Sequence, residues 1–224
     1  MLKWVTQSAS VRYVLPFAAF LLSVAVMPCL EVSPRTGEII RLVVVGGAVL
    51  LVARPLLDFR IRSWAGTVAM GVAVFVVWIA PDLLVAGYRD SPLFRNAVVG
   101  YGGSVVPEAV RTDLVFLTLR SVRAVVLVPI VEELFWRAWL PRWIIRRDFT
   151  AVPLGTYTTV AFIVTAVLFA SEHGAHWDVG LAAGILYNWW MIKTRSLGDC
   201  ILAHAVTNAC LAGYVIAGGQ WQYW

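Results

Sequence analysis

The sequence predicts an all-α polytopic membrane protein, a helical bundle of about seven to eight transmembrane helices. The 224-residue chain is 60% hydrophobic and only 14% charged, whereas soluble domains are about 45–50% apolar and about 25% charged. Its mean hydropathy is +0.79. Apolar runs long enough to cross a bilayer as helices recur along the chain and alternate with short basic segments.

The composition also indicates which partners to expect. A net charge of +5 does not indicate nucleic-acid binding, because the basic residues cluster between apolar runs without an aromatic–basic stripe. The expected partner is therefore the lipid bilayer. We interpret the C-terminal tryptophans, Trp221 and Trp224, as an interfacial anchor. Cys29, Cys200 and Cys210 show neither CxxC spacing nor a disulfide framework, so we expect buried small apolar residues.

The first half of the chain predicts three spans, at about residues 13–30, 39–57 and 64–86. Lys3 and Arg12 precede the first apolar run, but no convincing small-x-small cleavage site follows. We therefore expect a retained span rather than a signal peptide. Pro28 ends or distorts the last turn of this span. In the second span, Gly46 and Gly47 are expected close-packing points.

The middle of the chain is more polar. Residues 88–106 are typical of an extramembrane loop. Residues 107–123 begin with a Pro-Glu pair, which is common at a helix start, and then mix apolar residues with charged ones. We expect an interfacial or partly buried amphipathic helix here. If this segment were an eighth span, the orientation of the later half would be inverted.

The second half predicts four spans, at about residues 124–143, 154–172, 179–192 and 196–217. Ser196 and Asp199 have the spacing of a capping box at the start of the last span. With the N-terminus cytoplasmic, the 18 lysines and arginines divide into ten inside, seven outside and Arg137 within a span. The positive-inside rule favours this orientation by a small margin.

The central motif lies in the run from Val128 to Leu140, where Glu132, Glu133 and Arg137 interrupt an apolar sequence. Ionised side chains at such depth are costly unless they are paired or functional. Glu133 and Arg137 are four residues apart, so they share a helix face and form a favourable ion pair. Glu132 points about 100° away from Glu133 on a helix. It has no partner one turn away, and we interpret it as the functional carboxylate.

Two further motifs supply polar side chains in later spans. Phe169 and His173 form one, and His204 and Asn208, which share a helix face, form the other. Together with Glu132 they provide a carboxylate, two imidazoles and a carboxamide. A desolvated carboxylate hydrogen-bonded to an imidazole can take a proton from water. An imidazole and a carboxamide can donate to a developing oxyanion. The set is sufficient for water-mediated hydrolysis.

These motifs resemble those of the CPBP family, the intramembrane glutamic endopeptidases that include the Ras-converting-enzyme type of CAAX prenyl protease. EExxxR, FxxxH and HxxxN occur in the family's order, over about residues 124–213. Within the family, the chain is most similar to the bacterial CAAX-protease-related branch. The matching residues are Glu132, Glu133, Arg137, Phe169, His173, His204 and Asn208.

The resemblance implies a role for each matching residue. Glu132 and His173 would activate water, and His204 and Asn208 would stabilise the oxyanion. Glu133 and Arg137 would support and orient the site. The resemblance implies a site open to membrane and water, with no metal or other cofactor.

The resemblance also implies an organisation and a setting. Residues 1–110 would hold N-terminal transmembrane helices and a loop, and residues 111–224 the catalytic membrane core. The partner would be a peptide or protein substrate, with or without a lipid at its C-terminus, in the inner membrane of a bacterium.

Two other functions remain open. One is a zinc protease that uses Glu132, His173 and His204, since two histidines and one glutamate form a known catalytic zinc set, although no HExxH is present. The other is a non-enzymatic membrane immunity or scaffold protein of the same family. Span counting also raises a geometric question. It places His173 near one membrane face, while Glu132 and Asn208 fall near mid-depth.

Overall fold

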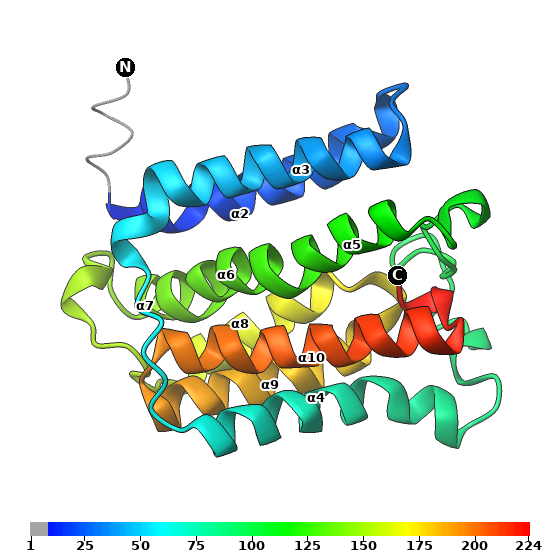
Figure 1. Ribbon diagram of the computed structural model, residues 1–224. Coiled ribbons are helices and arrows are strands. Elements are labelled where there is room, and N and C mark those ends of the chain that lie inside the picture. The colour runs from blue at the N-terminus through cyan, green and yellow to red at the C-terminus, as the bar shows by residue number, and fades with distance from the viewer. Residues whose placement is uncertain (1–8) are drawn as a thin grey trace.

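The computed structural model describes residues 9–224, and within this range every named element is helical. The helices lie side by side, roughly parallel or antiparallel, in one bundle (Figure 1). The only β-type pairing in the described residues is an isolated bridge between Asn96 and Gly100. Lys3, part of the expected N-terminal basic segment, lies outside the described residues. The all-α fold class is confirmed.

The α-helices follow one another in a simple order. They are α2 (Ala9–Val26), α3 (Pro34–Ala48), α4 (Trp64–Leu84), α5 (Leu114–Val122), α6 (Val128–Glu133), α7 (Leu140–Ile145), α8 (Thr159–Ser171), α9 (Trp177–Thr194) and α10 (Leu197–Gly218). Two π-helical segments, η6 (Arg123–Leu127) and η7 (Leu134–Trp139), join α5, α6 and α7 into one continuous rod.

Five of these rods in the described chain are long and apolar enough to cross a membrane, which makes the protein an integral multi-pass one. They are Ala9–Cys29, Pro34–Leu56, Trp64–Leu84, Leu114–Ile145 and Leu197–Gly218. The helix α8 is apolar but has only 13 residues, and α9 packs against α8, α4 and α10. Ser196 Oγ accepts from the Asp199 backbone N–H at 3.2 Å, so the predicted cap of α10 is confirmed.

The α-helix expected at residues 107–123, interfacial or partly buried, begins only at Leu114 and is partly buried, but it is not separate from the following span. It belongs to the continuous 32-residue rod Leu114–Ile145. Asp113 caps the start of this rod by accepting from the N–H groups of Val115 and Phe116. Two of the charged residues that suggested an interface, Arg120 and Arg123, pair with the buried Glu38 inside the bundle. Arg123 donates to Glu38 of α3, with Nε 2.6 Å from Oε2.

The chain connections gather at two opposite ends of the bundle (Figure 1). At one end, the Arg62 backbone N–H donates to Asp199 at 2.8 Å and thereby ties the start of α4 to the start of α10. At the other end, Tyr223 donates to Asp82 at 2.8 Å. Helices that alternate between two ends in this way are suited to crossing a membrane repeatedly.

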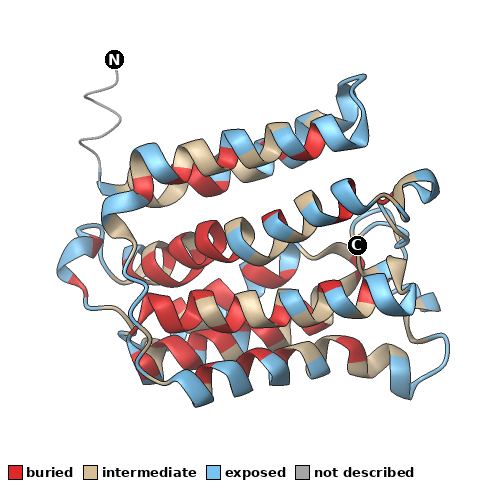
Figure 2. Cartoon of the chain, in the orientation of Figure 1, coloured by how far each residue is buried: buried red, intermediate tan, exposed pale blue. Residues whose placement is uncertain are grey.

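The buried residues concentrate where α6, α8, α9 and α10 meet, while the outer helices α2 and α3 expose much of their apolar surface (Figure 2). Two packing expectations are wrong. An added Cβ at Gly46 would meet only Leu127, at 3.9 Å, and one at Gly47 would meet nothing within 4 Å, so neither is a close-packing point. Cys29 is exposed, because it lies at the outer end of the first hairpin; Cys200 is buried and Cys210 half-buried.

Candidate functional site

The four residues expected to be catalytic line one cavity of about 150 Å³. Glu132 comes from α6, His173 from the turn after α8, and His204 and Asn208 from α10. The other lining residues come from α4, α6, α8, α9 and α10 and include apolar and aromatic side chains. They are Val74, Trp78, Val128, Phe169, Ala183, Tyr187, Thr207 and Leu211.

Glu132 is 7% exposed, and its Oε2 is buried without a hydrogen-bond partner in the described residues. A buried polar atom of this kind is costly and calls for an explanation. The shape of the helix that carries Glu132 explains how this carboxylate is directed into the cavity. Glu132 lies on the short α6, between the π-helical segments η6 and η7. Such single-turn π segments shift the register of a helix and are frequent at functional sites.

Glu133 lies beside Glu132 but has two partners. It is fully buried, and its Oε1 accepts from Nδ1 of His204 at 2.9 Å. Its Oε2 lies 3.3 Å from Nε of Arg137. Since an ionised carboxylate can only accept, His204 carries its proton on Nδ1, which leaves Nε2 for the cavity. Glu133 therefore connects the first motif to the third.

Arg137 connects the first motif to the second. It is 1% exposed, and its Cζ lies 4.7 Å from the ring centroid of Phe169 and 5.6 Å from that of Tyr187. These are cation–π distances, which stabilise a guanidinium removed from water. Phe169, the first residue of FxxxH, thus supports the arginine of EExxxR.

His173 is held in one tautomer. Its Nδ1 lies 2.7 Å from the carbonyl oxygen of Phe169. A carbonyl accepts only, so Nδ1 is the donor and a neutral His173 has an accepting Nε2. Trp78 packs edge-on against the ring, with centroids 5.2 Å apart. The helix α8 begins at Thr159, later than the expected span. His173, just after its end, therefore lies at the same depth as Glu132, and both line the cavity.

Asn208 donates through Nδ2 to the carbonyl oxygen of Ala124, in the π segment η6, at 2.8 Å. This bond uses one of the two N–H groups of the carboxamide and leaves the other. Asn208 is half-buried, so this remaining donor is accessible at the cavity wall.

Sequence reasoning missed Tyr187 and Thr207. The Tyr187 ring stacks on His204 with centroids 5.2 Å apart. Its hydroxyl donates to Thr207 Oγ1 at 2.7 Å, and Thr207 in turn donates to the Gly71 carbonyl oxygen at 2.7 Å. Thr207 lies inside HxxxN, but nothing in the sequence indicates that Tyr187 reaches the same site from α9.

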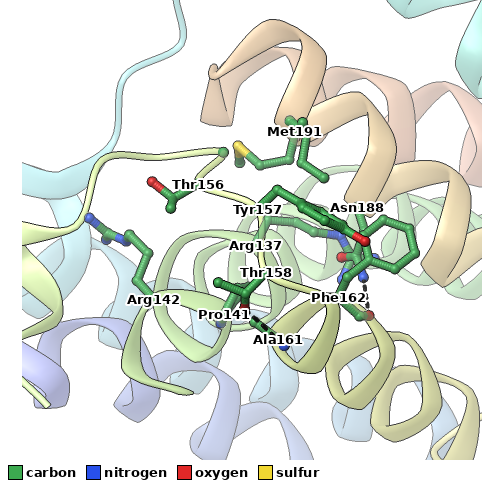
Figure 3. Close-up of a pocket in the computed structure, with 12 residues that line it drawn as sticks. Arg137, Pro141, Arg142, Thr156, Tyr157, Thr158, Ala161, Phe162, Asn188 and Met191 are labelled. Atoms are coloured by element: carbon green, nitrogen blue, oxygen red, sulfur yellow. Dashed lines mark hydrogen bonds between the residues drawn. The ribbon is translucent and has the colours of Figure 1, made fainter. Parts of the chain in front are cut away.

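Asn188, the neighbour of Tyr187, packs instead of lining this cavity. Its Nδ2 donates to the Phe162 carbonyl oxygen at 3.0 Å. It borders a separate pocket of about 30 Å³ (Figure 3), in which Arg137 and Tyr157 also lie.

Two further polar residues near the site lie outside the cavity. Glu172 caps the end of α8, and His176 stacks on Trp78 with ring centroids 6.3 Å apart. Within residues 9–224, no three or more His, Cys, Asp or Glu residues form a group that could hold a metal ion. Glu132, His173 and His204, the alternative zinc set, are therefore not arranged as such a group.

A family model matches part of the chain. The model described as "Type II CAAX prenyl endopeptidase Rce1-like" matches residues 114–210. This match confirms the family resemblance predicted from the three motifs, and it implies CAAX-type intramembrane protease activity on peptide or protein substrates. Neither the curated proteins nor the solved structures compared with the chain give a match.

Proposed function

We propose that the chain is an intramembrane endopeptidase in which Glu132 activates a water molecule for attack on a peptide bond, without a metal ion. One observation carries this proposal. Glu132, His173, His204 and Asn208 converge on one cavity, and Glu132 Oε2 is the buried atom there that lacks a partner. A water or substrate group would satisfy it.

In the proposed reaction, a water molecule lies between Glu132 and Nε2 of His173. Glu132 takes a proton as the water oxygen attacks the carbonyl carbon, and His173 accepts a hydrogen bond that orients the water. The carbonyl oxygen becomes an oxyanion, to which Nε2 of a protonated His204 and the second N–H of Asn208 donate. Glu132 then delivers its proton to the leaving amine as the C–N bond breaks.

The supporting residues keep these groups in position. Glu133 fixes the orientation of His204, because its Oε1 accepts from Nδ1 of the imidazole. Arg137 balances the charge of Glu133. We also propose the inner membrane of a bacterium as the location, on the basis of the branch that the motifs resemble, and substrates with or without a lipid at the C-terminus.

The decisive experiment compares the purified chain with its Glu132→Gln variant. The substrates are a prenylated CAAX peptide and an unmodified peptide library, each with and without a chelator. General-base catalysis contributes about 10²–10⁴-fold, so we expect the cleavage rate to fall by at least about 10²-fold. Cleavage by the wild type should be indifferent to the chelator.

Glu31→Gln is the matched control, because Glu31 is an exposed carboxylate that does not line the cavity. It should retain cleavage. Loss of cleavage on chelation would contradict the metal-independent mechanism. A cellular phenotype that survives Glu132→Gln would favour the non-enzymatic immunity or scaffold function.

A further inference from the structure

A second cavity of about 330 Å³ lies at the end of the bundle that holds the starts of α4 and α10. It is strongly basic. Its lining includes Arg60, Arg62, Arg142 and Arg195, against a single carboxylate, that of Asp58. Four positive charges and one negative charge leave a formal charge of +3 around the cavity.

Most of this charge is not neutralised by the protein. In the described residues, Arg62, Arg142 and Arg195 form no ion pair, and Asp58 lies 3.8 Å from Arg60, with both side chains exposed. Arg142 is 8% exposed and its guanidinium donates to the backbone carbonyls of Ala138 and Val152. The two carbonyls and the rings of Tyr13 and Phe149, whose centroids lie 5.5 and 5.2 Å from its Cζ, compensate the buried Arg142. The positive charge open to a ligand is therefore that of the exposed Arg60, Arg62 and Arg195.

Asp199, at the start of α10, does not neutralise these arginines. Asp199 accepts from the backbone N–H groups of Arg62 and Ser63, at 2.8 and 3.0 Å, and from the hydroxyl of Thr67, at 2.6 Å. Its oxygens are therefore engaged in holding the start of α10 to the start of α4. The guanidinium of Arg62 donates instead to the carbonyl oxygen of Thr194.

The backbone at Arg195 provides an independent observation. Arg195 has φ 50° and is the only non-glycine residue with a positive φ in the described chain. It occupies the C-terminal cap of α9, a position at which glycine or asparagine is the sterically preferred residue. Unfavourable backbone conformations of this kind cluster at functional sites. A ligand bound by the guanidinium would explain why an arginine, rather than glycine or asparagine, occupies this position.

The walls and the location indicate what kind of anion fits. Tyr13, Leu56, Leu154 and Leu197 supply apolar surface beside the arginines. The cavity lies at the ends of helices long and apolar enough to cross a membrane, and the ends of such helices meet the lipid headgroups. Positive-inside counting assigns this end to the cytoplasmic leaflet, whose anionic lipids attract basic clusters. The planar guanidinium of an arginine can donate two parallel hydrogen bonds to two oxygens of one phosphate.

We propose that this cavity binds the phosphate group of an anionic membrane lipid. The arginines receive the phosphate, and the apolar walls receive the adjoining glycerol and the first part of the acyl chains. The site contacts α2, α7 and the turn between α9 and α10, so an occupied site joins the N-terminal hairpin to the rod that carries Glu132. The proposal is independent of the peptidase activity.

The test measures unfolding temperature of the full chain in a non-ionic detergent as short-chain phosphatidylglycerol, phosphatidylcholine or inorganic phosphate is added. Phosphatidylglycerol should raise the unfolding temperature of the wild type in a saturable way, whereas phosphatidylcholine and inorganic phosphate at the same concentrations should not. Arg195→Asn and Arg62→Gln should each weaken the apparent affinity about tenfold or more, since each removes a charge-assisted contact.

Arg195→Asn keeps a residue that tolerates positive φ, so its unfolding temperature without lipid should equal or exceed that of the wild type. Arg147→Gln is the charge-matched control, because Arg147 packs on Trp143 outside the cavity, and it should retain the wild-type affinity. The proposal is overturned if Arg195→Asn and Arg62→Gln respond like the wild type. It is also overturned if Arg147→Gln loses as much affinity as they do. An equal response to inorganic phosphate would overturn the lipid as the source of the anion.

Discussion

Glu132 and Glu133 are adjacent in the chain but differ in their surroundings. Glu133 has His204 on one oxygen and Arg137 on the other, whereas Glu132 Oε2 has no partner. The 100° turn between successive helical residues produces this difference, because it points the two carboxylates at different neighbours. At the residue scale, one carboxylate is structural and the other is left available.

The buried ion pair of Glu133 and Arg137 leads to a prediction for Arg137→Met. Removing one partner of a buried ion pair leaves an uncompensated charge on Glu133, so the free energy of unfolding should fall by about 3–5 kcal/mol. The measurement is equilibrium unfolding in detergent micelles. The double variant Glu133→Gln/Arg137→Met removes both charges and should recover most of the loss. Its cleavage activity should remain low, because His204 loses its ionic partner. A double variant less stable than Arg137→Met alone would contradict this view of the pair.

At the scale of the element, the rod Leu114–Ile145 shows how a helix delivers a polar residue to a cavity. The rod changes from α to π and back, with π segments on both sides of α6. The Ala124 carbonyl in the first of these segments accepts from Asn208 of α10. The helix irregularity therefore serves two residues of the site, since it adjoins Glu132 and provides the acceptor that orients Asn208.

The packing of α4 against α10 gives a second prediction. A Cβ added at Gly71 would collide with the backbone carbonyl oxygen of Ala203 and lie 2.7 Å from Cβ of Val206. A backbone oxygen cannot rotate away, so Gly71→Ala should push the helices apart and reduce the free energy of unfolding by about 1–3 kcal/mol. It should also reduce cleavage, because α4 carries Trp78, which packs on His173.

Gly47→Ala is the matched control for this prediction. A Cβ at Gly47 meets nothing within 4 Å. The substitution should therefore be neutral or stabilise the helix by about 0.5–1 kcal/mol, since alanine loses less backbone entropy than glycine. The measurement is again equilibrium unfolding. Equal effects at the two positions would show that helix propensity, not helix separation, governs both.

At the scale of the whole molecule, the connections of successive helices lie at opposite ends of the bundle (Figure 1). The loop that contains Val98 lies at one end, and the segment that contains Thr150, between α7 and α8, lies at the other. Charge counting predicts that the second end is cytoplasmic. The same end carries the basic cavity lined by Arg62, Arg142 and Arg195, so the orientation also decides which leaflet that cavity meets.

The predicted orientation can be measured with single cysteines at two exposed positions. Val98 is 94% exposed and Thr150 is also exposed. In a Cys29→Ser background, a membrane-impermeant thiol reagent applied to intact cells from which the outer membrane has been removed should label Val98→Cys. It should label Thr150→Cys only after the membrane is opened. The reverse pattern would show that the N-terminal side of the bundle faces outward.

Much of the fold and the site could be predicted from sequence because the relevant signals are local. Long apolar runs predict spans, since a backbone in lipid must satisfy its own hydrogen bonds. The i,i+4 spacing of Glu133 and Arg137 predicts their contact, since it fixes both on one helix face. The division into residues 1–110 and 111–224 stays a prediction. The mechanistic roles of Glu132, His173, His204 and Asn208 stay predictions as well.

Only the tertiary structure decided the features that depend on partners distant in the chain. Glu38 pairs with Arg123, 85 positions away, and this contact explains why a segment that looked interfacial lies inside the bundle. Tyr187 reaches His204 from another helix. The cavity that joins Glu132 with His173 exists only because helix packing brings their elements together. Local sequence determines which polar side chains a helix carries and on which face they lie. Packing between helices determines which of those side chains meet, because a helix alone does not encode its neighbours.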